Sequence, residues 1–257
     1  LIFTITGVCN AAIARNIGAQ EAKGEVLFFI DGDMEIESGF LPKVISNNQL
    51  VYPFLSGICV DYNYNSKWEL VNIKPRNTIN GNEQKEYTTG GLFIISKELW
   101  HLIGGMDSRL KRSQVLDLGL RLAKIGYPLM RINKNLAKHH TLPYTSSARF
   151  FEAIGYFKYT ALLFKKHIFS KYYLKSFLRS QYSFLVLLFS LILLSFSYYF
   201  ALFYVLVLLV RSIKTSSTQQ YSICNHILFY LGRDFVILFS ILFYFPIKPK
   251  SEYISYF

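Results

Sequence analysis

The sequence contains few cysteines, and they are scattered. Cys9, Cys59 and Cys224 are the only three in 257 residues, without a C-x-x-C pair or an even count. Neither a disulfide framework nor a zinc site is therefore indicated, and a reducing compartment fits this composition. The sequence begins at Leu1 rather than at methionine, and no signal-peptide pattern precedes its first expected helix. We therefore expect an amino-terminal segment to be missing.

Acidic residues are scarce: 16 Asp and Glu stand against 28 Lys and Arg, a net charge of +12. Between Arg109 and Arg179, fifteen basic residues face only Asp117 and Glu152. The positive-inside rule predicts that this segment is cytoplasmic, and such a segment is attracted to anionic lipid headgroups. Nucleic-acid binding is the competing explanation. Because no nucleic-acid module is found among the motifs, we expect no nucleic-acid partner.

Charge is absent altogether from residues 183–210. A run of 18 or more such residues predicts a membrane span. As one helix it would measure about 42 Å, against a hydrocarbon core of ~30 Å. The run therefore predicts either one tilted span or a helical hairpin that turns near residues 195–199. Residues 227–247 form a weaker candidate for a return span, because Arg233 and Asp234 interrupt them.

Two carboxylates follow the most regular pattern in the chain. Small and apolar residues at helical spacing predict a helix over residues 11–23, and Val26 to Ile30 form a wholly apolar run typical of a buried strand of a parallel sheet. Asp31 and Asp33 stand where this strand ends. Ligands of open α/β sheets bind at this edge, and a divalent cation bridging to a diphosphate would need one or two carboxylates there. A solvated turn is the alternative explanation for D-G-D alone.

The remaining residues before 141 also predict alternating elements. Residues 1–6 predict a strand. Ser38 is expected to cap a helix over residues 39–47, and residues 49–62 are expected to contain a strand. The polar residues 63–86 predict a long exposed loop. An apolar strand follows Gly90 and Gly91, and Ser96 caps the next helix. Residues 115–124 fit a strand or a helix, and the helix is favoured. A short strand then ends in Lys138, His139 and His140.

The ordered set of motifs resembles the family 2 glycosyltransferases with the GT-A nucleotide-sugar fold. The similarity covers about residues 8 to 141 and is carried by R-N-I-G-A, D-G-D, T-G-G, G-G-M-D and D-L-G-L-R-L-A-K-I-G-Y. It implies a GT-A-like mixed α/β sheet that lacks its first strand, followed by an α-helical membrane segment. We therefore divide the chain into a truncated glycosyltransferase domain (1–145), basic amphipathic juxtamembrane helices (146–182) and a transmembrane region (183–257).

The resemblance implies a membrane-associated transferase that moves a sugar, with inversion, from a nucleotide-diphosphate donor to a lipid-linked or saccharide acceptor in cell-envelope polysaccharide or glycolipid synthesis. Its catalytic domain would face the cytoplasm at the inner or plasma membrane, and Mg²⁺ or Mn²⁺ would assist the leaving diphosphate. The Q-x-x-R-W motif of processive synthases is absent, which favours transfer of one sugar. The implied metal ligands are Asp31, Asp33 and, as a secondary candidate, His140. The implied substrate-binding residues are Arg15, Asn16, Asp31, Gly90, Gly91 and Gln114.

One departure concerns the catalytic base. Family members usually carry Glu-Asp three and two positions before the Asp that matches Asp117, but here these positions hold Gln114 and Val115. General-base assistance normally contributes about 10²–10⁴ in rate. Asp117 could substitute, an ionised lipid phosphate could serve as an acceptor that needs no base, or this copy could be an inactive, membrane-anchored remnant.

A strand that ends in D-x-D also begins the haloacid dehalogenase phosphatases, in which the first Asp is a nucleophile. That family needs a later lysine followed by an acidic pair. Lys134 has no such pair after it, and here a full helix precedes the D-x-D strand. The glycosyltransferase interpretation is therefore preferred.

Overall fold

The computed structural model describes residues 2–46, 49–142, 147–217, 221–256. The chain divides into two compact units, which we describe separately. The first consists of Leu1–Tyr144 together with Lys248–Phe257, and the second of Thr145–Ile247. The predicted boundary at 145 and 146 lies outside the described residues.

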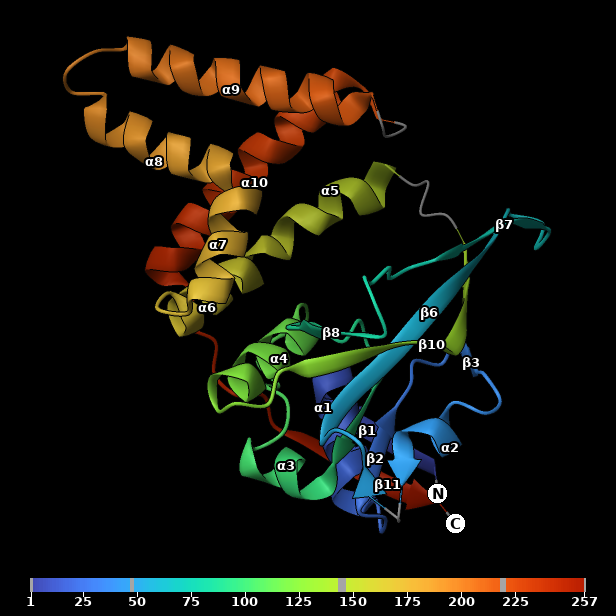
Figure 1. Cartoon of the computed structure of the whole chain (residues 1–257). Coiled ribbons are helices and arrows are strands. Elements are labelled where there is room, and N and C mark those ends of the chain that lie inside the picture. Colours follow the sequence, from blue (N-terminus) through green and yellow to red (C-terminus); the bar gives the residue numbers. More distant parts are fainter. Residues whose placement is uncertain (1, 47–48, 143–146, 218–220, 257) are drawn as a thin grey trace. The chain divides into compact units, whose positions relative to one another are not determined.

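A seven-stranded mixed sheet forms the centre of the first unit (Figure 1). Its main order is β2 (Val26–Phe29), β9 (Phe93–Ser96), β6 (Phe54–Tyr64), β10 (Leu129–Thr141) and β3 (Met34–Ile36). Strands β7 (Leu70–Pro75) and β8 (Glu83–Glu86) pair with β6 and β10. Among the described pairs of this sheet, β6 and β10 alone run parallel. The apolar run before Asp31 is therefore not the parallel strand that its composition predicts, since β2 pairs antiparallel with β9.

Three helices contribute to the larger core cluster of this unit: α1 (Ala11–Glu21), α3 (Lys97–Leu102) and α4 (Gln114–Lys124). Asn10 caps α1 by accepting from two backbone N–H groups, and Ser96 caps α3 as predicted. The preference for a helix over residues 115–124 is confirmed. Leu118 and Leu122, four residues apart, are both fully buried on the inner face of α4.

Two further expectations from the sequence are wrong. The helix predicted over 39–47 is only one turn, α2 (Leu41–Val44), and the chain continues into the short hairpin β4 (Ile45–Ser46) and β5 (Gln49–Leu50). The long loop predicted over 63–86 contains β7 and β8. Strand β7 is exposed at every residue. It therefore has no buried face to produce an alternating apolar pattern, and its pairing with β6 is invisible in the sequence.

The two ends of the chain form a separate ribbon within the first unit. Strand β1 (Ile2–Gly7) pairs antiparallel with β11 (Ser251–Tyr256), from Ile2 opposite Tyr256 to Gly7 opposite Ser251. The Tyr253 hydroxyl donates a 2.6 Å hydrogen bond to Glu21 of α1. Residues 251–256 fall within the transmembrane region expected from the sequence, but in the structure they are a strand of the first unit.

The second unit is helical. It contains α5 (Ser147–Gly155), α6 (Phe157–His167), α7 (Lys171–Ser180), α8 (Tyr182–Leu193), α9 (Tyr199–Ser216) and α10 (Ile223–Phe243). The uncharged run is therefore a hairpin of α8 and α9, with its turn at residues 194–198, and not one long helix. In the part of the chain that the structure describes, α9 and α10 are long and apolar enough to cross a membrane, and α7 and α8 pass the same test as a pair bent by 79°.

The mixed sheet followed by apolar helices confirms the predicted fold class. The part of that prediction that concerns a missing first strand stays a prediction.

Candidate functional site

The turn after β2 places Asp31 and Asp33 at the edge of the sheet. The Asp31 carbonyl accepts a 3.2 Å hydrogen bond from Met34 N–H, which closes the D-G-D-M turn. The Asp33 carbonyl accepts from His140 N–H of β10 at 2.9 Å. The two side chains remain 42% and 56% exposed. Each carboxylate is therefore anchored by its backbone and is open to solvent, as a ligand site requires.

Asp31 lies between two segments that are far apart in the sequence. Its Oδ1 accepts a 2.5 Å hydrogen bond from Arg15 Nη2 of α1. On its other side is Gly91, where a side-chain Cβ would stand 2.3 Å from Asp31 Oδ2. Gly91 also has φ +87°, a conformation that side chains disfavour. The R-N, D-G-D and T-G-G motifs therefore meet at one carboxylate.

Asn16 holds α1 to the G-G-M-D loop. Its Oδ1 accepts from Met106 N–H at 2.8 Å, and its Nδ2 donates to Met106 carbonyl at 2.9 Å. A Cβ at Gly105 would lie 2.6 Å from Asn16 Oδ1, so the glycine permits this close approach. Arg15 Nη1 also contacts Met106 Sδ at 4.0 Å. Asn16 thus braces the segment that carries Arg15, and its amide is occupied by the backbone.

Asp33 leads into a chain of charged and polar groups. Its Oδ2 lies 3.2 Å from His139 Nε2, and His139 Nδ1 lies 2.9 Å from Asp61 Oδ1. Arg76 pairs with the same Asp61 oxygen at 2.9 Å and also contacts His139. His139 is largely buried, with 9% of its surface exposed. This network fixes the imidazole beside Asp33.

His140, the secondary metal candidate, has other partners. Its Nδ1 lies 2.9 Å from the Tyr64 hydroxyl, and its Nε2 lies 3.6 Å from Glu35 Oε2. Its neighbour His139 is the histidine that contacts Asp33. The sequence pattern does not distinguish His139 from His140, because they are adjacent residues of one strand and only the fold decides which of the two opposite faces lies toward Asp33. The sequence pattern also missed Asp61 and Arg76, for which the only signal was an Asp following the buried residues of β6.

The segment expected to carry the catalytic base, residues 114–117, has its polar side chains buried. Asp117 is fully buried, and its Oδ2 accepts from Arg121 Nε at 2.9 Å. Gln114 is also buried and donates to Leu110 carbonyl at 2.6 Å, and Val115 packs against the core. The structure therefore gives Asp117 a structural contact rather than the exposed position of a base. It likewise turns Gln114 inward, away from the substrate role expected for it.

The donor set fits a divalent cation shared with a ligand. Mg²⁺ is usually held by one or two protein carboxylates together with phosphate oxygens and water. Asp31 and Asp33 supply such oxygens. Within the described residues there is no group of three or more His, Cys, Asp or Glu side chains arranged to hold a metal. A cation here would accordingly take the rest of its coordination from a bound diphosphate.

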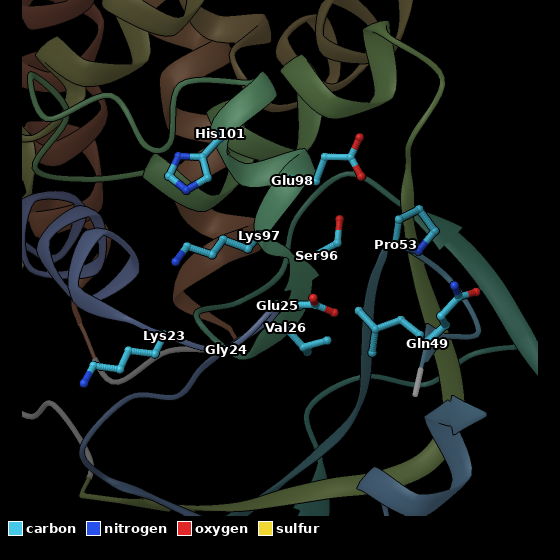
Figure 2. A pocket seen from close by; sticks show the side chains of 11 residues that line it. Lys23, Gly24, Glu25, Val26, Gln49, Pro53, Ser96, Lys97, Glu98 and His101 are labelled. Carbon is cyan, nitrogen blue, oxygen red and sulfur yellow. The ribbon is translucent and has the colours of Figure 1, made fainter. Parts of the chain in front are cut away.

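The cavity drawn in Figure 2 is not this site. Its volume is about 780 Å³, and it lies at the other end of β2, around Val26 and its sheet partner Ser96. Lys97, Glu98 and His101 of the β9–α3 segment line it together with Lys23 and Glu25 from before β2 (Figure 2). Since Asp31 and Asp33 follow the opposite end of β2, this cavity does not include the carboxylates.

Comparison with known proteins finds a family match within the first unit. Residues 2–106 match the family model of glycosyl transferase family 2. No curated protein matches the sequence. Among solved structures, one of GalNAc-T7 with UDP, GalNAc and Mn²⁺ is 16% identical with a TM-score of 0.40. That match covers 52% of this chain and 30% of the other, so this chain spans less than a third of its length.

Proposed function

We propose, from the premise that residues 2–106 are a glycosyl transferase family 2 segment, that this chain transfers one sugar from a nucleotide-diphosphate donor with inversion. Asp33 and Asp31 would hold a Mg²⁺ or Mn²⁺ ion that neutralises charge on the leaving diphosphate. Arg15, paired with Asp31, would orient that carboxylate. Gly90 and Gly91 would let the backbone approach the donor sugar, because neither carries a side chain.

One observation carries the proposal: Arg15, Asp31 and Gly91 come from three separate segments and are in contact. A solvated turn would leave Asp31 without such partners. Here one exposed carboxylate is fixed from both sides while part of its surface stays free for a ligand. This arrangement is what preorganised binding of a cation and a diphosphate needs.

We propose a lipid phosphate as the acceptor. Val115 cannot accept a proton, and Asp117 and Gln114 are buried, so the usual base is lacking. A phosphate that is already ionised has no proton to lose and can attack the sugar without a base. The apolar helices of the second unit would keep such an acceptor at the membrane.

The Val115→Asp variant tests this choice. We expect it to add transfer to a sugar hydroxyl, by up to about 10²-fold, because it restores a carboxylate at the family position. Transfer to a polyprenyl phosphate should stay unchanged. The proposed acceptor is wrong if neither the unmodified chain nor the variant transfers sugar to the lipid phosphate and the variant gains transfer to a sugar hydroxyl.

A second candidate is a protein that binds the nucleotide sugar without transferring it. The buried Gln114 and the partly buried Val115 at the base positions favour it. Calorimetry of the purified chain with a panel of nucleotide sugars, with Mn²⁺ and with EDTA, separates the candidates. An active transferase binds a donor in a metal-dependent way and also transfers its sugar. A binding protein shows metal-dependent binding without transfer. Absence of metal-dependent binding to every donor contradicts both.

The connectivity of the units supports a membrane topology. Residues before and after the helical unit belong to the same first unit, through the pairing of β1 with β11. The chain must therefore leave and return on one side, which requires an even number of crossings. We propose that the α8–α9 hairpin enters the membrane and returns, that α10 stays at the surface, and that the first unit is cytoplasmic.

The native cysteines test this topology. Cys9 and Cys224 are exposed, whereas Cys59 is buried. Burial raises the pKa of the Cys59 thiol, which reduces its reactive thiolate at neutral pH and makes it an internal control. An impermeant maleimide should label Cys9 and Cys224 only in inside-out vesicles. Labelling of Cys224 from the opposite side to Cys9 would contradict the proposed α8–α9 hairpin with α10 at the surface, and would favour crossings by α9 and α10. The variants C9S and C224S identify each signal.

A further inference from the structure

The helical unit has a large excess of positive charge. Residues 145–247 contain ten Lys and Arg but only two carboxylates, Glu152 and Asp234. Glu152 is exposed on α5, whereas Asp234 is fully buried in α10. Anions that balance the cationic side chains of this unit must therefore come from outside its own sequence.

Asp234 is already shared among several donors. Its Oδ1 accepts from Arg233 Nη2 at 2.6 Å, and its Oδ2 accepts from Ser183 at 2.6 Å and from Tyr204 at 3.2 Å. Arg233 Nη2 also donates to Ser183 Oγ at 2.6 Å. One buried carboxylate thus neutralises one buried guanidinium and joins α8, α9 and α10.

Arg211 of α9 is a second guanidinium at the same place. It donates to Ser183 Oγ at 3.1 Å and to the Ser180 carbonyl at 2.9 Å. Its Cζ lies 4.4 Å from the Tyr182 ring centre and 4.3 Å from that of Tyr230. Among the described residues it has no carboxylate within salt-bridge distance, since the neighbouring Asp234 pairs with Arg233. Arg211 is therefore held by neutral groups, and no carboxylate in the described part of the chain pairs with its charge.

The surroundings of Arg211 are basic on one side and apolar on the other. Arg179 at the end of α7 and Lys214, one turn after Arg211, are both exposed. Away from this end, the hairpin exposes large apolar side chains, among them Phe189, Ile192, Leu202, Phe203 and Val205. A ligand that fits both surfaces carries a phosphate and an acyl chain.

We propose that Arg211, with Arg179 and Lys214, binds the phosphate of an anionic phospholipid at the open end of the α8–α9 hairpin. The buried Asp234 network positions Arg211, and the exposed apolar side chains contact the acyl chains. A free phosphate would satisfy the charge but would leave the apolar side chains exposed. The site is independent of the proposed transferase function, because its occupancy requires no donor.

Lipid retention tests the proposal. The full chain, purified in an uncharged detergent, is mixed with phosphatidylglycerol or phosphatidylcholine, and bound lipid is counted by native mass spectrometry. We expect preferential retention of phosphatidylglycerol. Arg211→Gln should lower it by roughly tenfold, the effect of one charge-assisted hydrogen-bonding group. Lys158→Gln removes the same charge from α6 and should change little. Equal retention of both lipids, or equal losses in the two variants, overturns the proposal.

A second variant keeps the test valid if Arg211→Gln fails to fold. Lys214 is exposed, so Lys214→Gln should preserve the helix content in circular dichroism and still lower phosphatidylglycerol retention, by about two- to threefold as a peripheral charge. Retention unchanged in this variant argues against the site. Release of the lipid by an equimolar amount of inorganic phosphate would identify free phosphate as the ligand and overturn the lipid assignment.

Discussion

Two aspartates of the first unit each pair with an arginine, but they differ in how far the carboxylate is exposed to solvent. Asp31 pairs with Arg15 and keeps 42% of its side chain exposed, whereas Asp117 pairs with Arg121 and is fully buried. Arg121 also donates to the carbonyls of Ile103 and Gly105, which ties α4 to the end of α3. The first pair leaves oxygen surface free for a ligand, and the second is part of the core. Exposure, rather than charge, separates the candidate site from the scaffold.

The largest effect should come from the exposed carboxylates. We expect Asp33→Asn, and similarly Asp31→Asn, to lower sugar transfer by about 10²–10³-fold, because each removes charge that would hold the cation. Thermal unfolding should change little in either variant. Transfer rates with Mn²⁺ and with EDTA measure the effect. Full activity in Asp33→Asn would contradict the assignment of the cation to this turn.

Asp117 should show the reverse behaviour. Removal of one partner from a buried ion pair costs about 3–5 kcal/mol, so Asp117→Ala should strongly lower the free energy of unfolding. Chemical denaturation of the full chain in detergent measures this. Glu37, partly exposed and 3.8 Å from Lys138, is the matched control, and Glu37→Ala should cost less than ~1 kcal/mol. If folded Asp117→Ala bound the donor normally but lost transfer, Asp117 would be catalytic after all.

Two adjacent glycines test whether the loop before β9 contacts the Asp31 carboxylate. Gly90 and Gly91 both have positive φ, but only at Gly91 would a Cβ collide with the Asp31 carboxylate. We expect Gly91→Ala to weaken donor binding by roughly tenfold or more through displacement of Asp31. Gly90→Ala should cost only about 1 kcal/mol of backbone strain. Calorimetric donor affinity distinguishes them, and equal affinities would argue against contact between this loop and the site.

The smallest effect should separate the two histidines. His139 contacts Asp33, and His140 contacts Tyr64. His139→Asn should lower metal affinity by about tenfold through loss of a contact that orients Asp33, whereas His140→Asn should leave it nearly unchanged. Titration of Mn²⁺ in the presence of donor provides the measurement. A larger loss in His140→Asn would restore His140 as the ligand.

Local patterns predicted many of the elements around the site. The helix before the D-G-D strand, the Ser96 cap and the helix over 115–124 were recognisable because each depends on short-range spacing or on one hydrogen bond. Strand β7 was missed because both of its faces are exposed. The sequence did not decide between a helical hairpin with its turn at residues 194–198 and one long tilted helix, because an uncharged run of this length fits both arrangements.

The sequence alone indicated the similarity of residues 2–106 to glycosyl transferase family 2, the mixed α/β class of the first unit and the order of its motifs, since these follow from local patterns along the chain. Only the tertiary structure decided which charged groups meet. Contacts between Arg15 and Asp31, between His139 and Asp33, and between Ser183 and Arg211 join residues on different elements. Their side chains are brought together by packing, which leaves no periodic signal in the sequence. Packing also buried Asp117 and left Asp31 open.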